Sequence, residues 1–176
     1  MEKVKLLVVT ILGVLVVFLI STSIVTNVSS LEQNVKISRY TLCSNIKEYN
    51  ETIKQFLEID NEYNNIDYYI SSDINNKSIM LDECMEEGDI EKINNSFLSL
   101  VSSSNSLLTI NYNDTNEFFS FVILRTKLSS LETKIFISQQ IYNNAVRQYN
   151  EKIVSFPTAI VSLLYGFNTV PYFEIN

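Results

Sequence analysis

The run Leu124–Tyr149, "LRTKLSSLETKIFISQQIYNNAVRQY", carries the clearest periodic pattern in the chain and decides its fold class. Its apolar or small residues recur at alternating steps of four and three: Leu124, Leu128, Leu131, Ile135, Ser138, Tyr142, Ala145 and Tyr149. Such steps keep one stripe of a helix facing one neighbour over about seven turns, as in a coiled coil or an antiparallel bundle. The run therefore predicts a long helix, with Asp114 or Thr115 as its N-cap residue.

Two shorter stripes precede this run. The first comprises Leu42, Ile46, Tyr49, Ile53 and Phe56, and the second comprises Ile90, Ile93, Phe97 and Leu100. Both predict amphipathic helices. The stretch 60–78 is rich in Asn, Asp and Ser, so we interpret it as a connection. Since the chain has only 3 Gly and 2 Pro in 176 residues, its composition favours long helices over many short strands.

The closing segment predicts a short helix from Ser155 to about Gly166. Ser155 is its expected cap, Pro157 suits its first turn, and Gly166 suits the left-handed position after its last turn. Apolar residues nearly encircle this helix, so it should lie in a groove or press against lipid. The tail from Pro171 to Glu174 is expected to pack back along the bundle.

Residues 6–26, "LLVVTILGVLVVFLISTSIVT", contain no charge. About 20 apolar residues suffice to span a bilayer as a helix, so residues 1–28 are predicted to be a transmembrane anchor and residues 29–176 a helical bundle. A cleaved signal peptide is the alternative, although its apolar region is usually only about 7–15 residues long. Lys3 and Lys5 precede the span, which favours a cytoplasmic N-terminus and a body outside.

Charge and composition narrow the function classes. The net charge is −7, and the first 26 residues carry +1, which leaves −8 on residues 27–176. An acidic body disfavours nucleic-acid binding. There is no His, and Cys43 and Cys84 are the only cysteines, so we predict no catalytic, metal or cofactor site and no enzyme activity. The acidic cluster 82–89 lacks calcium-loop spacing and is interpreted as a solvated helix start.

The two thiols leave two alternatives open. A Cys43–Cys84 disulfide requires an oxidising compartment, whereas two reduced cysteines would serve as small core residues.

The segment Tyr142–Glu174, "YNNAVRQYNEKIVSFPTAIVSLLYGFNTVPYFE", closely resembles the C-terminal half of the LemA family. In that family a Tyr-Asn-x-x-Val-x-x-Tyr-Asn run leads to Phe-Pro, then Gly-Phe and a closing Phe-Glu. The residues in register are Tyr142, Asn143, Ala145, Val146, Tyr149, Asn150, Phe156, Pro157, Gly166, Phe167, Pro171, Phe173 and Glu174. Upstream, Leu128, Glu132 and Ile135 match a similar Leu…Glu…Ile series, so the resemblance covers about residues 120–174.

The chain departs from the family pattern at two places. The stretch "NIKEYNETIKQFLEI" lacks the double Arg and the Pro that relatives carry there, and Ser138, Gln139 and Gln140 replace an Arg before the first Tyr-Asn. Glu132 therefore needs another partner, such as Arg147, Lys134 or solvent.

The resemblance implies an all-α protein, with one N-terminal transmembrane helix followed by an antiparallel bundle of long helices. It does not imply an enzyme, and relatives are often described with a cytoplasmic body, against the charge bias found here. The Tyr-Asn pairs are interpreted as packing and register devices between helices rather than as ligand contacts.

We therefore predict a membrane-anchored helical scaffold that holds the bilayer through residues 6–26 and binds another membrane or envelope protein, or a second copy of itself. The alternative is an extracytoplasmic sensor whose bundle binds a small ligand and signals through the anchor helix. A buried apolar pocket with converging polar groups would favour the sensor.

Overall fold

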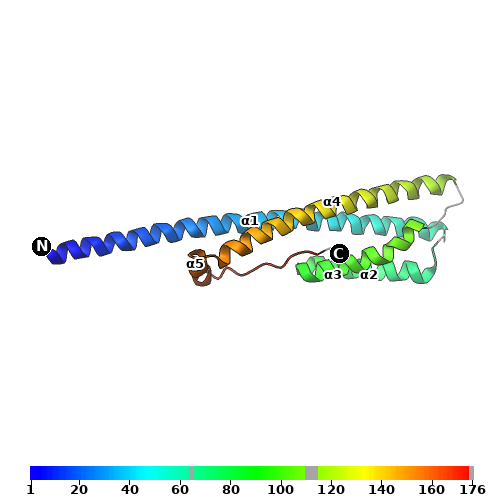
Figure 1. Cartoon of the computed structure of the whole chain (residues 1–176). Coiled ribbons are helices and arrows are strands. Elements are labelled where there is room, and N and C mark those ends of the chain that lie inside the picture. The colour runs from blue at the N-terminus through cyan, green and yellow to red at the C-terminus, as the bar shows by residue number, and fades with distance from the viewer. Residues whose placement is uncertain (64–65, 110–114, 175–176) are drawn as a thin grey trace. The chain divides into compact units, whose positions relative to one another are not determined.

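The computed structural model describes residues 1–63, 66–109 and 115–174. Its elements are α1 (Glu2–Tyr63), α2 (Tyr68–Glu87), α3 (Ile90–Ser104), the 3-10 helix η1 (Asn105–Thr109), α4 (Thr115–Val154) and α5 (Thr158–Tyr165) (Figure 1). Across these three described ranges there is no strand, so the predicted all-α class is confirmed. Thr115 is the first residue of α4, and the other predicted cap, Asp114, lies outside the described residues.

The chain divides into two compact units. The first unit comprises Met1–Ile37 and Asn144–Val170, and the second comprises Ser38–Asn143 and Pro171–Asn176. Both α1 and α4 contribute residues to each unit. The expected division into an anchor at 1–28 and a bundle at 29–176 stays a prediction.

In the second unit, α1 and α4 pack as antiparallel neighbours. Their contacts include Asn45 with Ser138, Tyr49 with Glu132, and Phe56 with Phe121. Since partners move back along α4 as they move forward along α1, the two helices run in opposite directions. The predicted stripes supply this core: Leu42, Ile46, Tyr49, Ile53, Phe56, Leu124, Leu128, Leu131, Ile135 and Tyr142 are all buried.

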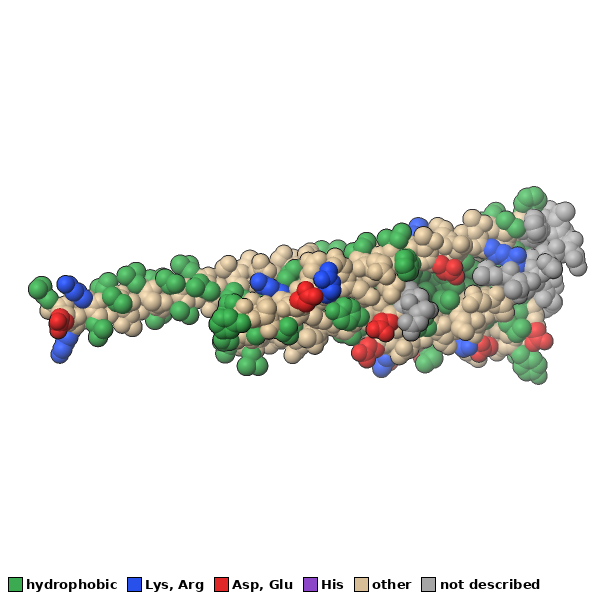
Figure 2. Space-filling model, in the orientation of Figure 1, with side chains coloured by type: hydrophobic (Ala, Val, Ile, Leu, Met, Phe, Trp, Pro, Cys, Tyr) green, Lys and Arg blue, Asp and Glu red, His purple; other side chains and the backbone are tan. Residues whose placement is uncertain are grey.

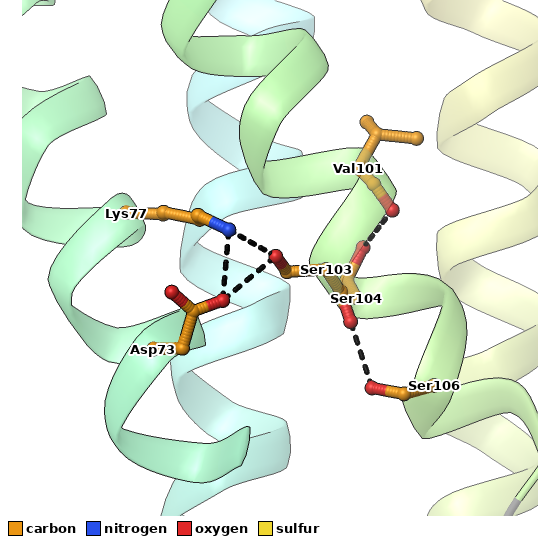
Figure 3. Close-up of polar contacts among 6 residues, drawn as sticks. All are labelled: Asp73, Lys77, Val101, Ser103, Ser104 and Ser106. Carbon is orange, nitrogen blue, oxygen red and sulfur yellow. Dashed lines mark hydrogen bonds and ion pairs between the residues drawn. The ribbon is translucent and has the colours of Figure 1, made fainter. Parts of the chain in front are cut away.

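Helices α2 and α3 form a second antiparallel pair in this unit. Near the start of α2, Lys77 and Ser103 both hydrogen-bond Asp73, and Lys77 also contacts Ser103 (Figure 3). At the other end of the pair, Cys84 lies 3.2 Å from Ser96. These contacts fasten the two helices at both ends.

The interpretation of 60–78 as a connection is wrong. Helix α1 continues to Tyr63, and α2 begins at Tyr68, where the Asp67 carboxylate accepts a hydrogen bond from the Tyr69 N–H at 2.8 Å. Ser78 is fully buried in the seam of α2 and donates a 2.7 Å hydrogen bond to Asn50. Because packing overrides the weak helix propensity of Asn and Ser, composition misled the prediction.

The prediction that the acidic cluster 82–89 is a helix start is likewise wrong. Most of the cluster forms the last turns of α2. Gly88 ends that helix at φ 71°, in the left-handed region that favours glycine. Asp89 then caps α3 by accepting from the N–H groups of Glu91 and Lys92. Lys92 also pairs with Glu87 at 2.6 Å, so opposite charges bracket the turn.

In the first unit, α1 emerges from complete exposure into a packed region. Every apolar side chain from Leu6 to Ile20 is at least 48% exposed, and Figure 2 shows hydrophobic side chains along this part of the helix. Val28 and Val35 are buried, as are Tyr149 and Ile153 at the end of α4. The helix continues without a break from its apolar start into this packing.

Helix α5 differs from its prediction at its start and at its surface. Ser155 does not cap it, because its hydroxyl donates back to the carbonyl of Lys152, and the helix begins at Thr158. Gly166 ends it at φ 75°, as predicted. Most of its apolar side chains face outward, so the alternative of a helix sunk in a groove is wrong.

Candidate functional site

The family-like residues of α4 gather around the C-terminal tail, residues 171–174. In the second unit the Asn143 side chain accepts a 2.9 Å hydrogen bond from the Phe173 N–H and donates a 2.7 Å hydrogen bond to the Phe173 carbonyl. The Tyr142 hydroxyl donates to the Pro171 carbonyl at 2.9 Å. The Phe173 ring is fully buried and lies 6.4 Å from the ring of Phe97. We call this set of contacts the tail clasp.

The first unit repeats the same chemistry. Asn150 accepts from the Val170 N–H at 2.9 Å and donates to the Val170 carbonyl at 2.8 Å. A side-chain amide offers one donor and one acceptor, so an asparagine satisfies both backbone groups of an extended residue. The asparagines of both Tyr-Asn pairs therefore bind backbone of the returning chain, rather than a neighbouring helix.

The spacing of the motif follows from this pairing. Seven residues of α-helix advance about 10.5 Å, and three residues of extended chain advance about 10 Å. A helix with asparagines seven residues apart thus suits a tail whose paired residues, Val170 and Phe173, are three apart in sequence.

A glutamine binds the tail backbone near the position where relatives carry an arginine. Gln139 is buried and donates a 3.0 Å hydrogen bond to the Phe173 carbonyl, which also receives the Asn143 amide. Sequence reasoning named Gln139 only as a departure from the family pattern. Gln139 directly follows Ser138, a member of the predicted stripe, and both side chains are buried. That position next to the stripe was the signal that could have identified it.

Glu132 takes a partner that the sequence did not suggest. The Tyr49 hydroxyl lies 3.4 Å from its carboxylate and 3.0 Å from the Ser104 hydroxyl, so one tyrosine links α1, α3 and α4. Ser104 in turn donates to the Val101 carbonyl (Figure 3). Arg147, one of the expected partners, instead lies 3.5 Å from Glu151.

The remaining family-like residues have packing or turn positions. Val146 and Tyr149 are buried, Ala145 and Phe167 are half-buried, Gly166 ends α5, and Phe156, Pro157, Pro171 and Glu174 are exposed. Phe167 stacks on Tyr165 at 6.5 Å. Near the end of the stripe the buried position is Val146 rather than Ala145. A straight α-helix has about 3.6 residues per turn, whereas a strict seven-residue repeat assumes about 3.5, so the buried side moves to a later residue.

Replacing Asn150 with Ala should destabilise the first unit by about 1–3 kcal/mol, because both backbone groups of Val170 lose their partner. Thermal unfolding followed by circular dichroism measures the change. Asn144→Ala is the matched control, since Asn144 is exposed and accepts a hydrogen bond from the side chain of Arg147 rather than from the returning chain. An equal loss in both variants would contradict the role given to Asn150.

Burial shifts the titration of two tyrosines in the second unit. Desolvation raises the pKa of Tyr49 to about 12, with a smaller upward contribution from the Glu132 carboxylate and an opposing one from the hydrogen bond to Ser104. Desolvation also raises the pKa of Tyr142 to about 12. An unfolded tyrosine ionises near pH 10, so the unfolded chain loses these protons first.

Stability should therefore be complete below about pH 10 and fall between about pH 10 and 12, by about 2 kcal/mol for each tyrosine. Urea unfolding across this range measures the fall. The double variant Tyr49→Phe, Tyr142→Phe should lose this part of the fall, whereas the exposed control Tyr68→Phe should keep it. The same alkaline profile in the double variant would refute the assignment.

The comparison with protein families covers the segment that contains the tail clasp. The LemA family model matches residues 77–176, from within α2 to the end of the chain. The chain belongs to the LemA family. The match begins well upstream of residue 120, where the sequence resemblance was first evident, and so includes α3 and all of α4. No curated protein matches the chain.

The groups around this LemA motif that could bind a metal or act as a nucleophile are few. Within the described ranges, no group of three His, Cys, Asp or Glu side chains could hold a metal. Both cysteines are free, with Cys84 buried and Cys43 half-buried, and desolvation raises the pKa of the Cys43 thiol. A raised thiol pKa makes a poor nucleophile at neutral pH. The absence of catalysis remains a prediction.

A shallow groove lies beside Glu132 in the second unit. It has a volume of about 220 Å³ and is lined by Phe97, Leu98, Val101, Glu132, Ile135 and Phe136. Ligand pockets for small molecules usually measure about 300–1,000 Å³. The groove is thus smaller than a typical ligand site.

Proposed function

We propose that this LemA-family chain is a single-pass membrane protein whose helical body binds another protein and carries out no catalysis. The observation that carries the proposal is the contrast within α1. Its apolar side chains from Leu6 to Ile20 are all exposed, while Val28 and Val35 further along are buried. Among the described helices, α1 alone is long and apolar enough to cross a bilayer.

The continuity of α1 favours an anchor over a cleaved signal peptide. The helix passes through residue 26 without interruption, and Val28 is fully buried two residues later. Cleavage near this point would cut a packed helix, which proteases disfavour because the backbone must first unfold.

An exposed apolar strip on α4 supports the proposed protein contact. Phe136, Ile137 and Ile141 are 53–56% exposed, and Phe136 also borders the groove beside Glu132. Exposed apolar side chains gathered in one place are typical of interaction sites. The partner we favour is another membrane protein or a second copy of this chain, because the anchor confines both to the same surface.

The test is amine crosslinking in intact membranes, followed by purification in mild detergent. The chain should yield one stoichiometric crosslinked product, and the variant Ile137→Lys, Ile141→Lys should lose it. Ser129→Lys, Thr133→Lys is the matched control, since both side chains are exposed on the same helix. A monomer without partner, or equal products from all three proteins, would refute the proposal.

For orientation we propose a body outside the cytoplasm, supported by Lys3 and Lys5 before the span. The native cysteines would label slowly on either side because both are at least half-buried. Tyr68→Cys, placed in a Cys43→Ser, Cys84→Ser background, provides an exposed thiol. An impermeant maleimide should label it in intact cells, whereas labelling only after lysis would place the body in the cytoplasm.

The groove beside Glu132 keeps the sensor as a second candidate. A sensor requires a small apolar molecule to copurify with the chain, and Val101→Phe, which narrows the groove, should then remove that molecule. Mass spectrometry of the extracted protein measures both results. An empty extract would leave the protein-binding role as the better proposal.

A further inference from the structure

The outward face of α5 is apolar and lacks charge. Three of its large side chains are mostly exposed, namely Ile160, Leu163 and Leu164, and so is Phe156 just before the helix. Leu163 is 85% exposed, although the helix buries Thr158, Val161 and Ser162 on its other face. The helix is thus held to the first unit by one side and presents the other side outward.

The surrounding sequence is also free of charge. No Asp, Glu, Lys or Arg occurs between Lys152 and Glu174, and Tyr165 lies beside Leu164 with its ring 59% exposed. Burying such a segment in hydrocarbon incurs no cost for a buried ion. Tyrosines of this kind are enriched where a bilayer meets water.

The position of α5 in the first unit indicates what covers its outward face. On α1 all side chains up to Ile20 are exposed, and burial then sets in through the half-buried Ser21, Ile24 and Val25 to the buried Val28. Residues 144–170 form one compact unit with residues 1–37 of α1. In Figure 1, α5 lies at the end of this unit's α4 segment that is nearer the N-terminus.

This point coincides with the end of the proposed membrane span. Residues 6–26 extend for about 31 Å as a helix, close to the thickness of the hydrocarbon core. Burial on α1 begins between residues 21 and 28, so the packed part of the first unit, to which α5 belongs, starts at the level of the lipid headgroups. Figure 2 shows hydrophobic side chains at the place of α5 as well as along the span.

We propose that α5 is a second membrane contact, an interfacial helix that buries Ile160, Leu163 and Leu164, together with the preceding Phe156, in the bilayer surface. This proposal rests on the proposed anchor. The chain itself leaves this apolar face uncovered. The proposal explains this, because the lipid that surrounds the exposed apolar surface of α1 would also cover α5. An interfacial helix of this kind typically enters about 5–10 Å into the bilayer.

The natural chain has no Trp, so a single introduced Trp reports on one position. We would reconstitute three full-length variants, Leu163→Trp, Phe18→Trp and Tyr68→Trp, in phosphatidylcholine vesicles with or without brominated acyl chains. All three sites are exposed in the chain, so the substitutions should leave the fold intact. Bromine quenches a Trp only when the ring reaches the acyl chains.

The proposal expects bromolipid to remove about half or more of the emission of Leu163→Trp and Phe18→Trp, and little of that of Tyr68→Trp. If bromolipid quenched Phe18→Trp but not Leu163→Trp, the interfacial helix would be overturned and the anchor kept. Quenching of Leu163→Trp alone would keep the interfacial helix and overturn the anchor. Emission from Leu163→Trp that is blue-shifted but unquenched would show a protein partner on α5, such as a second copy, and would also overturn the proposal.

Discussion

Replacing Phe173 with Ala should lower the stability of the second unit by about 3–5 kcal/mol, the largest effect expected from a single substitution in the tail. The ring is fully buried and packs near Phe97, so its removal leaves a cavity that the helices cannot close without moving. The loss also weakens the hold of the tail clasp, because the backbone of Phe173 binds both Gln139 and Asn143.

The neighbouring residue provides the control. Tyr172 is 42% exposed, and Tyr172→Ala removes an aromatic ring of similar size from the same tail. Urea unfolding in detergent, followed by far-UV circular dichroism, should show a large shift for Phe173→Ala and less than about 1 kcal/mol for Tyr172→Ala. Similar shifts in both variants would mean that the tail does not dock through Phe173.

Placing arginine at Leu12 and Val16 should prevent stable membrane attachment. Both residues lie near the middle of the apolar run, and each arginine there costs about 2.5–3.5 kcal/mol for insertion. The double variant should therefore shift from the membrane fraction to the soluble or degraded fraction, as measured by immunoblotting after ultracentrifugation.

The control for added charge places arginine at Tyr68 and Tyr69, which are 79% and 81% exposed on α2. That variant should remain with the membranes. If Leu12→Arg, Val16→Arg also remained there, attachment would depend on a part of the chain other than the apolar run.

Long helices with strict periodicity were predictable because burial repeats at fixed steps. The stripe from Leu124 to Tyr142 is buried in α4 as its spacing predicted, and the buried side then shifts from Ala145 to Val146. The stretch 60–78 was not predictable in this way, since its helix buries Ser78 and pairs it with Asn50. A polar residue that is satisfied by a distant partner carries no local signal of burial.

The candidate site was predictable in its residues but not in its geometry. The Tyr-Asn pairs were identified by resemblance to the family, yet Asn143 and Asn150 bind the backbone of an extended tail, which has no periodicity of its own. Tyr49 as the partner of Glu132 joins residues 83 positions apart, so no spacing rule could indicate it.

The same limit applies to α5. Its all-round apolar sequence predicted a covered helix and left open whether protein or lipid covers it, since both environments favour the same residues. The structure adds that Leu163 and Leu164 face outward, so the rest of the chain does not cover them.

The most direct test of the account is alkaline carbonate extraction of membranes that contain the unaltered chain, followed by intact mass measurement of the retained protein. We predict that the chain stays in the carbonate-washed pellet, is released by detergent, and still contains residues 1–26. Release by carbonate, or a retained species that lacks residues 1–26, would contradict an uncleaved transmembrane anchor.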